Sequence, residues 1–136
     1  MLSPKDLVDG AVNFHGHLGP FLILGLRAGL SGVDYLGKDY FKLKAKVETA
    51  SHPPRSCFID GVQFASGCTT GKGNIEVKVS DKVSVEFTLG ERKIKLGVRN
   101  DILEALDYVS SNNQAELISK EFMQKTDTEL FLISKN

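Results

Sequence analysis

Two histidines stand one residue apart in a segment that is punctuated by glycine and proline. His15 and His17 flank Gly16, and Gly19 and Pro20 follow them. On a helix, side chains at this spacing point about 200° apart and cannot share an ion. In a turning or extended segment they can face the same way. Neutral imidazoles are common zinc ligands, so we interpret the pair as candidate metal ligands. The alternative is a helix cap followed by a hydrogen-bonded loop histidine.

The only two cysteines, Cys57 and Cys68, form the second candidate group. On one unbroken helix they would lie about 16 Å apart along the axis, too far for a disulfide or for a shared ion. Ser56 can cap a helix over Cys57–Ser66. Because a helix N-terminus lowers the pKa of a thiol, Cys57 is the better thiolate candidate. The alternative that Cys68 is the thiolate ligand in place of Cys57 remains open. Either cysteine can equally be a small buried hydrophobic residue.

The glycine-rich segment 67–74 could bind part of a ligand. It does not match the Walker A pattern, because its spacing is one residue short and no Ser or Thr follows Lys72. A nest of backbone N–H groups with Thr69, Thr70 and Lys72 could still hold an anionic or polar group. The ligand-binding candidates of this segment are Cys68, Thr69 and Lys72. The alternative is a simple connection into the next strand.

The elements that must position these residues can be read from caps and periodicity. Ser3 and Pro4 open a helix that should end near His15, and an apolar helix is expected over Pro20–Leu36. The glycines within that apolar helix would be tolerated if another backbone packs closely against it. Alternating apolar and polar residues predict strands over residues 43–49, 74–79, 83–89 and 92–98. Apolar residues at helical spacing predict further helices over residues 100–109 and 114–125. Residues 130–133 form a short apolar tail.

These elements predict an α+β fold, a single domain over residues 1–136. The last three strands should form an antiparallel β-sheet meander packed against several helices. Seventeen basic residues balance seventeen acidic ones, which argues against a dedicated nucleic-acid or anionic-membrane binder. The apolar run 21–26 is about a third of a membrane span, and the first ten residues lack the pattern of a signal peptide. We therefore expect a soluble, cytoplasmic protein.

Taken together, FHGHLGPFLILGLRAG and CFIDGVQFASGCTTGKGN resemble the FmdE family, which is related to the FmdE component of formylmethanofuran dehydrogenase. The resemblance implies an α+β domain that forms a homodimer and holds a metal between the HxH segment and a cysteine. It also implies a link to one-carbon metabolism, through a larger dehydrogenase complex that uses molybdenum or tungsten elsewhere. Family members commonly read HGHxCPG, whereas Gly19 stands at the cysteine position here. No cysteine follows Cys68, so we expect the form that lacks the C-terminal zinc-binding module.

The leading hypothesis is an FmdE-like metal-binding protein in which His15, His17 and Cys57 hold a divalent transition metal, with zinc as the expected ion. Segment 68–72 would line the cleft. Whether the protein is an enzyme is left open. The alternative is a non-catalytic accessory subunit or small-ligand binding module, with structural histidines and with the apolar helix Pro20–Leu36 as its partner or dimer interface.

Overall fold

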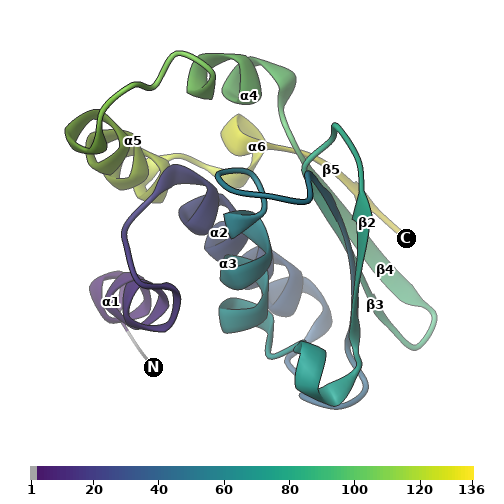
Figure 1. Ribbon diagram of the computed structural model, residues 1–136. Coiled ribbons are helices and arrows are strands. Elements are labelled where there is room, and N and C mark those ends of the chain that lie inside the picture. Colours follow the sequence, from purple (N-terminus) through teal and green to yellow (C-terminus); the bar gives the residue numbers. More distant parts are fainter. Residues whose placement is uncertain (1–2) are drawn as a thin grey trace.

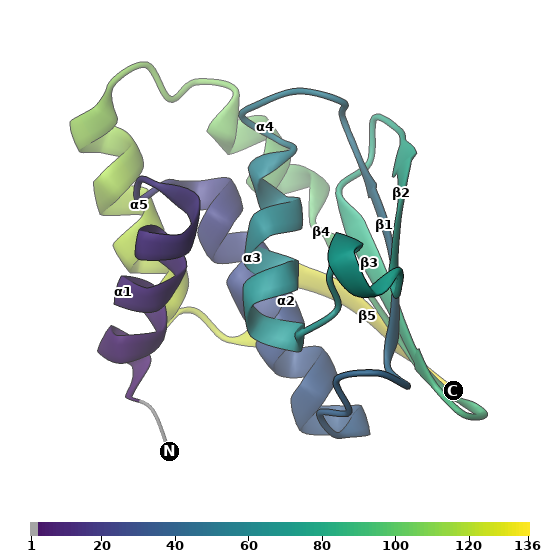
Figure 2. The same ribbon diagram turned by 60° about the horizontal axis from the view of Figure 1, so that its bottom comes forward.

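The protein is a layer of helices packed on one face of a five-stranded sheet. The structure, a computed structural model, describes residues 3–136. The helices are α1 (Pro4–His15), α2 (Pro20–Leu36), α3 (Cys57–Ser66), the 3-10 helix η1 (Thr70–Lys72), α4 (Asn100–Leu106), α5 (Asn112–Gln124) and α6 (Asp127–Leu130). The strands are β1 (Lys44–Thr49), β2 (Ile75–Val79), β3 (Ser84–Leu89), β4 (Arg92–Val98) and β5 (Phe131–Lys135). In Figures 1 and 2, α2 and α3 lie next to the sheet, and α1 and α5 lie outside them.

The α+β class is confirmed, but the predicted antiparallel meander is wrong for one strand. The strand order is β2-β1-β3-β4-β5, and β2 pairs with β1 in parallel. β3 and β4 form the expected antiparallel hairpin. The reason lies in the connection: α3 crosses over between β1 and β2, and such a crossover returns the chain in the same direction. The segment that is predicted as a short apolar tail forms a strand, because β5 pairs with β4 in antiparallel orientation.

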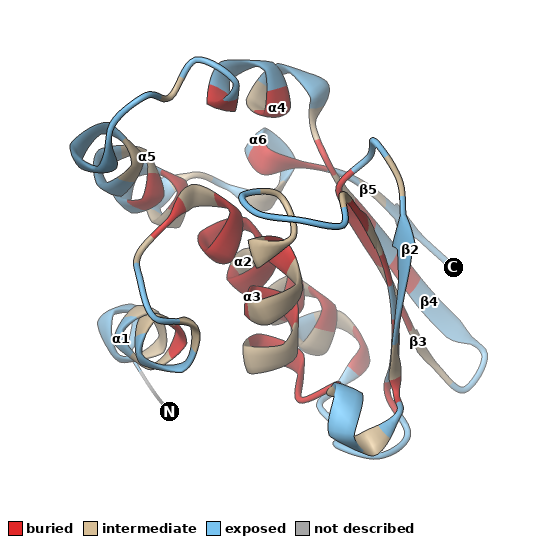
Figure 3. Ribbon diagram, in the orientation of Figure 1, coloured by how far each residue is buried: buried red, intermediate tan, exposed pale blue. Residues whose placement is uncertain are grey.

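Close contact between α2 and α3 forms the centre of the molecule. A Cβ atom at Gly25 would overlap the carbonyl oxygen of Phe58, and one at Gly61 would overlap the carbonyl oxygen of Leu22. The glycines therefore let the two backbones touch, as expected for this helix. Figure 3 shows the buried residues concentrated on α2, on α3 and on the sheet face that they cover. Most apolar residues of α2 are buried in this core. The helix is therefore not exposed as the partner or dimer interface that the accessory-subunit hypothesis assigns to it.

A charged contact holds the C-terminal segment to α2. The guanidinium of Arg27 donates a hydrogen bond to the carboxylate of Asp127 at 2.9 Å and another to the carbonyl oxygen of Phe122. Ser31 donates to the same carboxylate at 2.9 Å. These bonds fix the end of α5 and the start of α6 beside α2. Within residues 3–136, no helix has the length and apolar character needed to cross a membrane.

Candidate metal centre

His15 is the last residue of α1, and its ring is held by a carboxylate from α3. The N-cap Ser3 and its reciprocal bond with Asp6 start α1, and Gly16, with φ of 113°, ends it in the left-handed region. Nδ1 of His15 lies 2.6 Å from Oδ2 of Asp60. A carboxylate only accepts hydrogen bonds, so Nδ1 carries the proton in this pair.

The other ring nitrogen of His15 is buried without a partner. The side chain is 9% exposed, whereas that of Asp60 is 38% exposed. Nε2 of His15 makes no hydrogen bond. Among the described residues, the hydroxyl of Thr49 is the other buried side-chain group without a hydrogen-bond partner. With the proton on Nδ1, the lone pair of the neutral ring is on Nε2. A histidine that binds a metal through one nitrogen commonly donates its other N–H to a carboxylate in this way.

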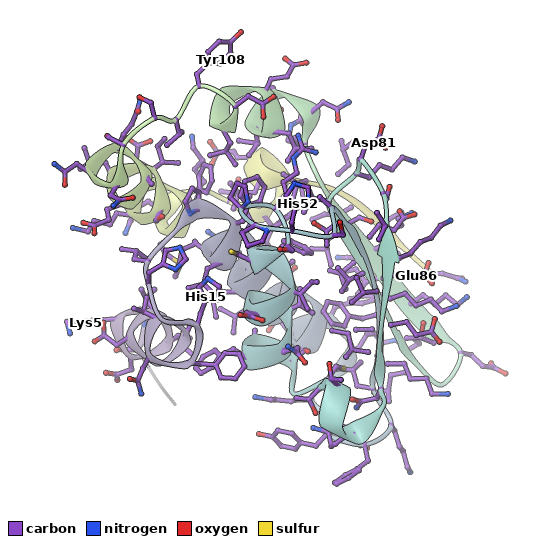
Figure 4. All side chains as sticks on the ribbon, in the orientation of Figure 1. Lys5, His15, His52, Asp81, Glu86 and Tyr108 are labelled. Carbon is purple, nitrogen blue, oxygen red and sulfur yellow. The ribbon has the colours of Figure 1, made fainter. Side chains whose placement is uncertain are left out.

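His17 lies beside His15, as the glycine-rich turn predicts. The centroids of the two rings are 4.7 Å apart, and the rings are tilted by 40°. The left-handed conformation of Gly16 turns the chain between them, which no helix could do at this spacing. Figure 4 places His15 in the space beside α1 and α3, whereas His52 lies apart from it in the connection between β1 and α3.

Cys57 and His17 line one cavity of about 220 Å³. The thiol is half-buried and unbonded to the other cysteine. Burial raises the pKa of the Cys57 thiol, and the nearby negative charge of Asp60 raises it further. The expected lowering by the helix N-terminus is therefore wrong. Ser56 makes no capping bond, and the first N–H groups of α3 donate to the carbonyls of Pro54 and Arg55 in the preceding turn.

Because residue 19 is a glycine, no side chain at this position contacts Nε2 of His17. A Cβ atom built at Gly19 would lie 3.2 Å from Nε2 of His17. Its φ of −147° is extended backbone, which any residue adopts. The side chain missing at this position would therefore sit against the second imidazole.

The segment that contains Cys68, Thr69 and Lys72 lies at the other end of α3, about 15 Å along the helix axis from Cys57. Cys68 is completely buried, and its thiol donates to the carbonyl of Leu43 at 3.4 Å. Burial raises the pKa of this thiol as well.

The polar groups of this segment bond to one another. The Thr69 N–H donates to Oδ1 of Asn74 at 2.8 Å, and the Lys72 ammonium donates to the carbonyl of Gly67. The structure does not bring these residues to the cavity that contains His17 and Cys57.

The cavity beside the histidines also uses residues that the sequence did not single out. The α4–α5 segment contributes Leu106, Val109, Asn112 and Ala115 to its wall. Asn112 is the polar group among them. No spacing or motif marks it, because it reaches the cavity only through the packing of α5 against α2. In the part of the chain that is described, no three His, Cys, Asp or Glu side chains converge on one point as a complete ligand set.

Comparison with known proteins identifies the family of this chain. The family described as FmdE, molybdenum formylmethanofuran dehydrogenase operon, matches residues 14–131. The chain belongs to the FmdE family.

Two relatives illustrate the range of proteins to which the chain is similar. The crystal structure of an FmdE-like protein of tungsten formylmethanofuran dehydrogenase type, from Syntrophus aciditrophicus, shares the fold with a TM-score of 0.72 at 18% identity, over 99% of this chain and 72% of that one. A probable S-adenosyl-L-methionine-binding protein of Archaeoglobus fulgidus is 29% identical over 116 residues, which are 84% of this chain. The chain spans only 29% of that relative's length.

Proposed function

We propose that this FmdE-family protein binds a divalent transition metal, with zinc as the leading candidate, through His15 and His17. The observation that carries the proposal is the buried, unpartnered Nε2 of His15, whose ring is oriented by Asp60. A neutral imidazole held in this tautomer fits a metal ligand. As a structural histidine alone, it would leave a buried acceptor without a donor, which costs about 1–3 kcal/mol.

Cys57 is the proposed third ligand. Its thiol lines the same cavity as His17 and would have to lose its proton to bind, against the raised pKa of the free thiol. A bound cation favours the thiolate, so metal binding should release that proton. His15, His17 and Cys57 would hold the ion as three protein ligands, and a zinc ion bound in this way would have one position left for a small molecule, which it would polarise as a Lewis acid.

The cavity indicates what kind of molecule could approach this position. No charged side chain of the described residues lines it. Its walls are mainly apolar, with Phe21, Leu106 and Val109 among them, and Asn112 offers an amide. Such a lining favours a small uncharged ligand with one polar group, because an ion would lose its hydration without a partner. The link to one-carbon metabolism and to a dehydrogenase complex rests on the family description and is part of the proposal.

The direct test is metal analysis of protein purified from zinc-replete medium. Wild-type protein should hold a stoichiometric ion, and the double variant His15→Ala/His17→Ala should lose it. The variant His52→Ala is the matched control, because His52 is exposed and lies outside the cavity. Wild-type protein that stays metal-free under these conditions would contradict the proposal.

A second candidate is a non-catalytic accessory role in a larger enzyme. The family description favours it, because it refers to the operon of a dehydrogenase. Co-purification with a larger dehydrogenase, without turnover by the isolated chain, would support this hypothesis.

A further inference from the structure

The face of the sheet that points away from α2 and α3 carries a hollow of about 520 Å³. In Figures 1 and 2, α2 and α3 lie on one side of the sheet, and no described helix packs flat on the other side. The walls of the hollow come from the β2–β3 turn, from β3, β4 and β5 and from α4, and they include Lys82, Ser84, Lys95, Gly97, Asn100 and Leu132. The hollow shares no lining residue with the cavity that contains His17 and Cys57, so it is a separate feature of the molecule.

Gly97 contributes bare backbone to this hollow, although no described residue requires a glycine there. It alternates along β4 with Leu96 and Val98, which are buried in the core, so its side-chain position faces the open side of the sheet. Its φ is not in the left-handed region. A Cβ atom built on it would meet only the Cβ atom of Ser84, at an ordinary contact distance of 3.9 Å. A glycine weakens a strand interior, and it often marks a place where a ligand approaches the backbone closely.

The residues beside Gly97 give the hollow an apolar surface. Ser84, Gly97 and Leu132 are neighbours across β3, β4 and β5. Leu132 is 62% exposed, and Leu103 of α4 also lines the hollow. The hydroxyl of Ser84 already donates to Glu48 at 3.3 Å. The backbone of Gly97 and the side chain of Leu132 therefore form a surface on which an aromatic ring or a hydrocarbon chain can pack.

The charged residues of the hollow favour an anion. Lys82 and Lys95 contribute two ammonium groups, and Asp81 contributes the one carboxylate among the lining residues, so the lining carries one net positive charge. Neither ammonium makes an ion pair within residues 3–136, although Glu86 is the cross-strand neighbour of Lys95. Both lysines are therefore free to pair with a negatively charged ligand.

We propose that this hollow binds a small organic anion. The apolar ring or chain of the ligand packs on Gly97 and Leu132, and its acidic group lies between Lys82 and Lys95.

Size and charge select this class of ligand. The volume of the hollow lies in the range of small-molecule sites, whereas a protein partner needs a much larger contact area. A singly charged acid such as a carboxylate fits the lining best, because Asp81 repels a doubly charged group such as a phosphate monoester more strongly. The ligand is thus a small carboxylic acid with an apolar body.

The test is a titration of metal-free protein with phenylacetate, followed by NMR, with phenylacetamide as the uncharged probe of the same shape. Phenylacetate should shift the resonance of the Gly97 N–H and bind about tenfold more tightly than phenylacetamide. Lys82→Gln and Lys95→Gln should each weaken phenylacetate binding about threefold and leave phenylacetamide binding unchanged. Lys93→Gln is the matched control, because Lys93 lies on the same face of β4 outside the hollow, and it should leave both affinities unchanged.

Filling the hollow at Gly97 gives a second, independent test. Gly97→Val should weaken the binding of both probes at least about tenfold, because the added side chain occupies the place of the ring. Its urea midpoint of unfolding should stay equal or rise, since valine favours a strand and its Cβ atom meets no close neighbour.

Three results would overturn the proposal. They are wild-type protein that binds neither probe, phenylacetate bound no more tightly than phenylacetamide, and unchanged phenylacetate affinity in Gly97→Val. Metal content plays no part in these measurements, so the proposal stands or falls separately from the metal site.

Discussion

Nδ1 of His15 and Oδ2 of Asp60 are 2.6 Å apart, although 45 residues separate them in the chain. The contact joins the end of α1 to the first turns of α3. It orients the ring and places a proton on Nδ1, whereas the other ring nitrogen is buried without a hydrogen-bond partner. Substitutions at this contact, at its neighbours and in the helix packing that supports it should each have a measurable effect.

Removing the carboxylate should weaken metal binding without removing a ligand. In Asp60→Ala, Nδ1 of His15 loses its acceptor, so we expect zinc affinity to fall about 10–100-fold in a chelator competition assay. Asp101→Ala removes an exposed carboxylate elsewhere and should leave the affinity unchanged. An unchanged affinity in Asp60→Ala would show that the His15–Asp60 bond serves only the fold.

Supplying a thiol beside His17 should strengthen metal binding. A side chain at position 19 starts 3.2 Å from Nε2 of His17, so Gly19→Cys adds a ligand next to the second imidazole. We expect zinc affinity to rise at least about tenfold, because thiolate is a preferred zinc ligand. Gly19→Ala adds the carbon without the sulfur and is the control. Equal affinities for the two variants would argue against a metal at this position.

Alkylation of metal-free protein should report the raised pKa of the Cys57 thiol. Because the thiolate is the reactive form, iodoacetamide at about pH 8 should modify Cys57 more slowly than an unstructured cysteine peptide. The rate should keep rising with pH beyond the point at which the peptide levels off.

Asp60→Asn removes a charge that raises this pKa and should increase the rate of alkylation, with modification assigned to Cys57 by mass spectrometry. Cys68, which is completely buried, should stay unmodified while the protein is folded. Alkylation of Cys57 as fast as that of the peptide would contradict the raised pKa.

Filling the contact between α2 and α3 should destabilise the fold. Alanine favours a helix over glycine by about 1 kcal/mol, yet a methyl group at Gly25 would overlap the backbone of α3. We expect Gly25→Ala to lower the free energy of unfolding by about 3 kcal/mol, measured by urea denaturation. Gly71→Ala, where nothing lies within 4 Å of the added carbon, should be neutral. A stabilised Gly25→Ala variant would mean that the helices can separate at no cost.

The sequence predicts the helices well, because their ends carry local signals. Ser3 with Pro4 starts α1, Pro20 starts α2, and Gly67 ends α3 at the expected residues. The positions of β1 to β4 along the chain are predictable too, whereas β5 is expected only as an apolar tail. The neighbours of each strand in the sheet are not predictable. Alternation says which face of a strand is buried, and it does not say that β1 inserts between β2 and β3.

Some features of the candidate site are likewise predictable from the sequence, and others are not. The turn at Gly16 is local, so the proximity of the His15 and His17 rings is predictable. The pairing of His15 with Asp60 and the arrival of Asn112 depend on how distant helices pack, and no pattern in the sequence marks either. The predicted direction of the Cys57 pKa shift is wrong because burial and a neighbouring charge outweigh the helix N-terminus.

The glycine contact between α2 and α3 has a consequence for how an ion would enter and leave. His17 is joined to α2 by a short turn, and Asp60 and Cys57 belong to α3, so the contact sets the spacing of these groups through the rigid core. The proposed ligands are thus preorganised by interactions that need no cation. We infer that the proposed site keeps its shape without an ion, so an ion can enter and leave without unfolding of the domain.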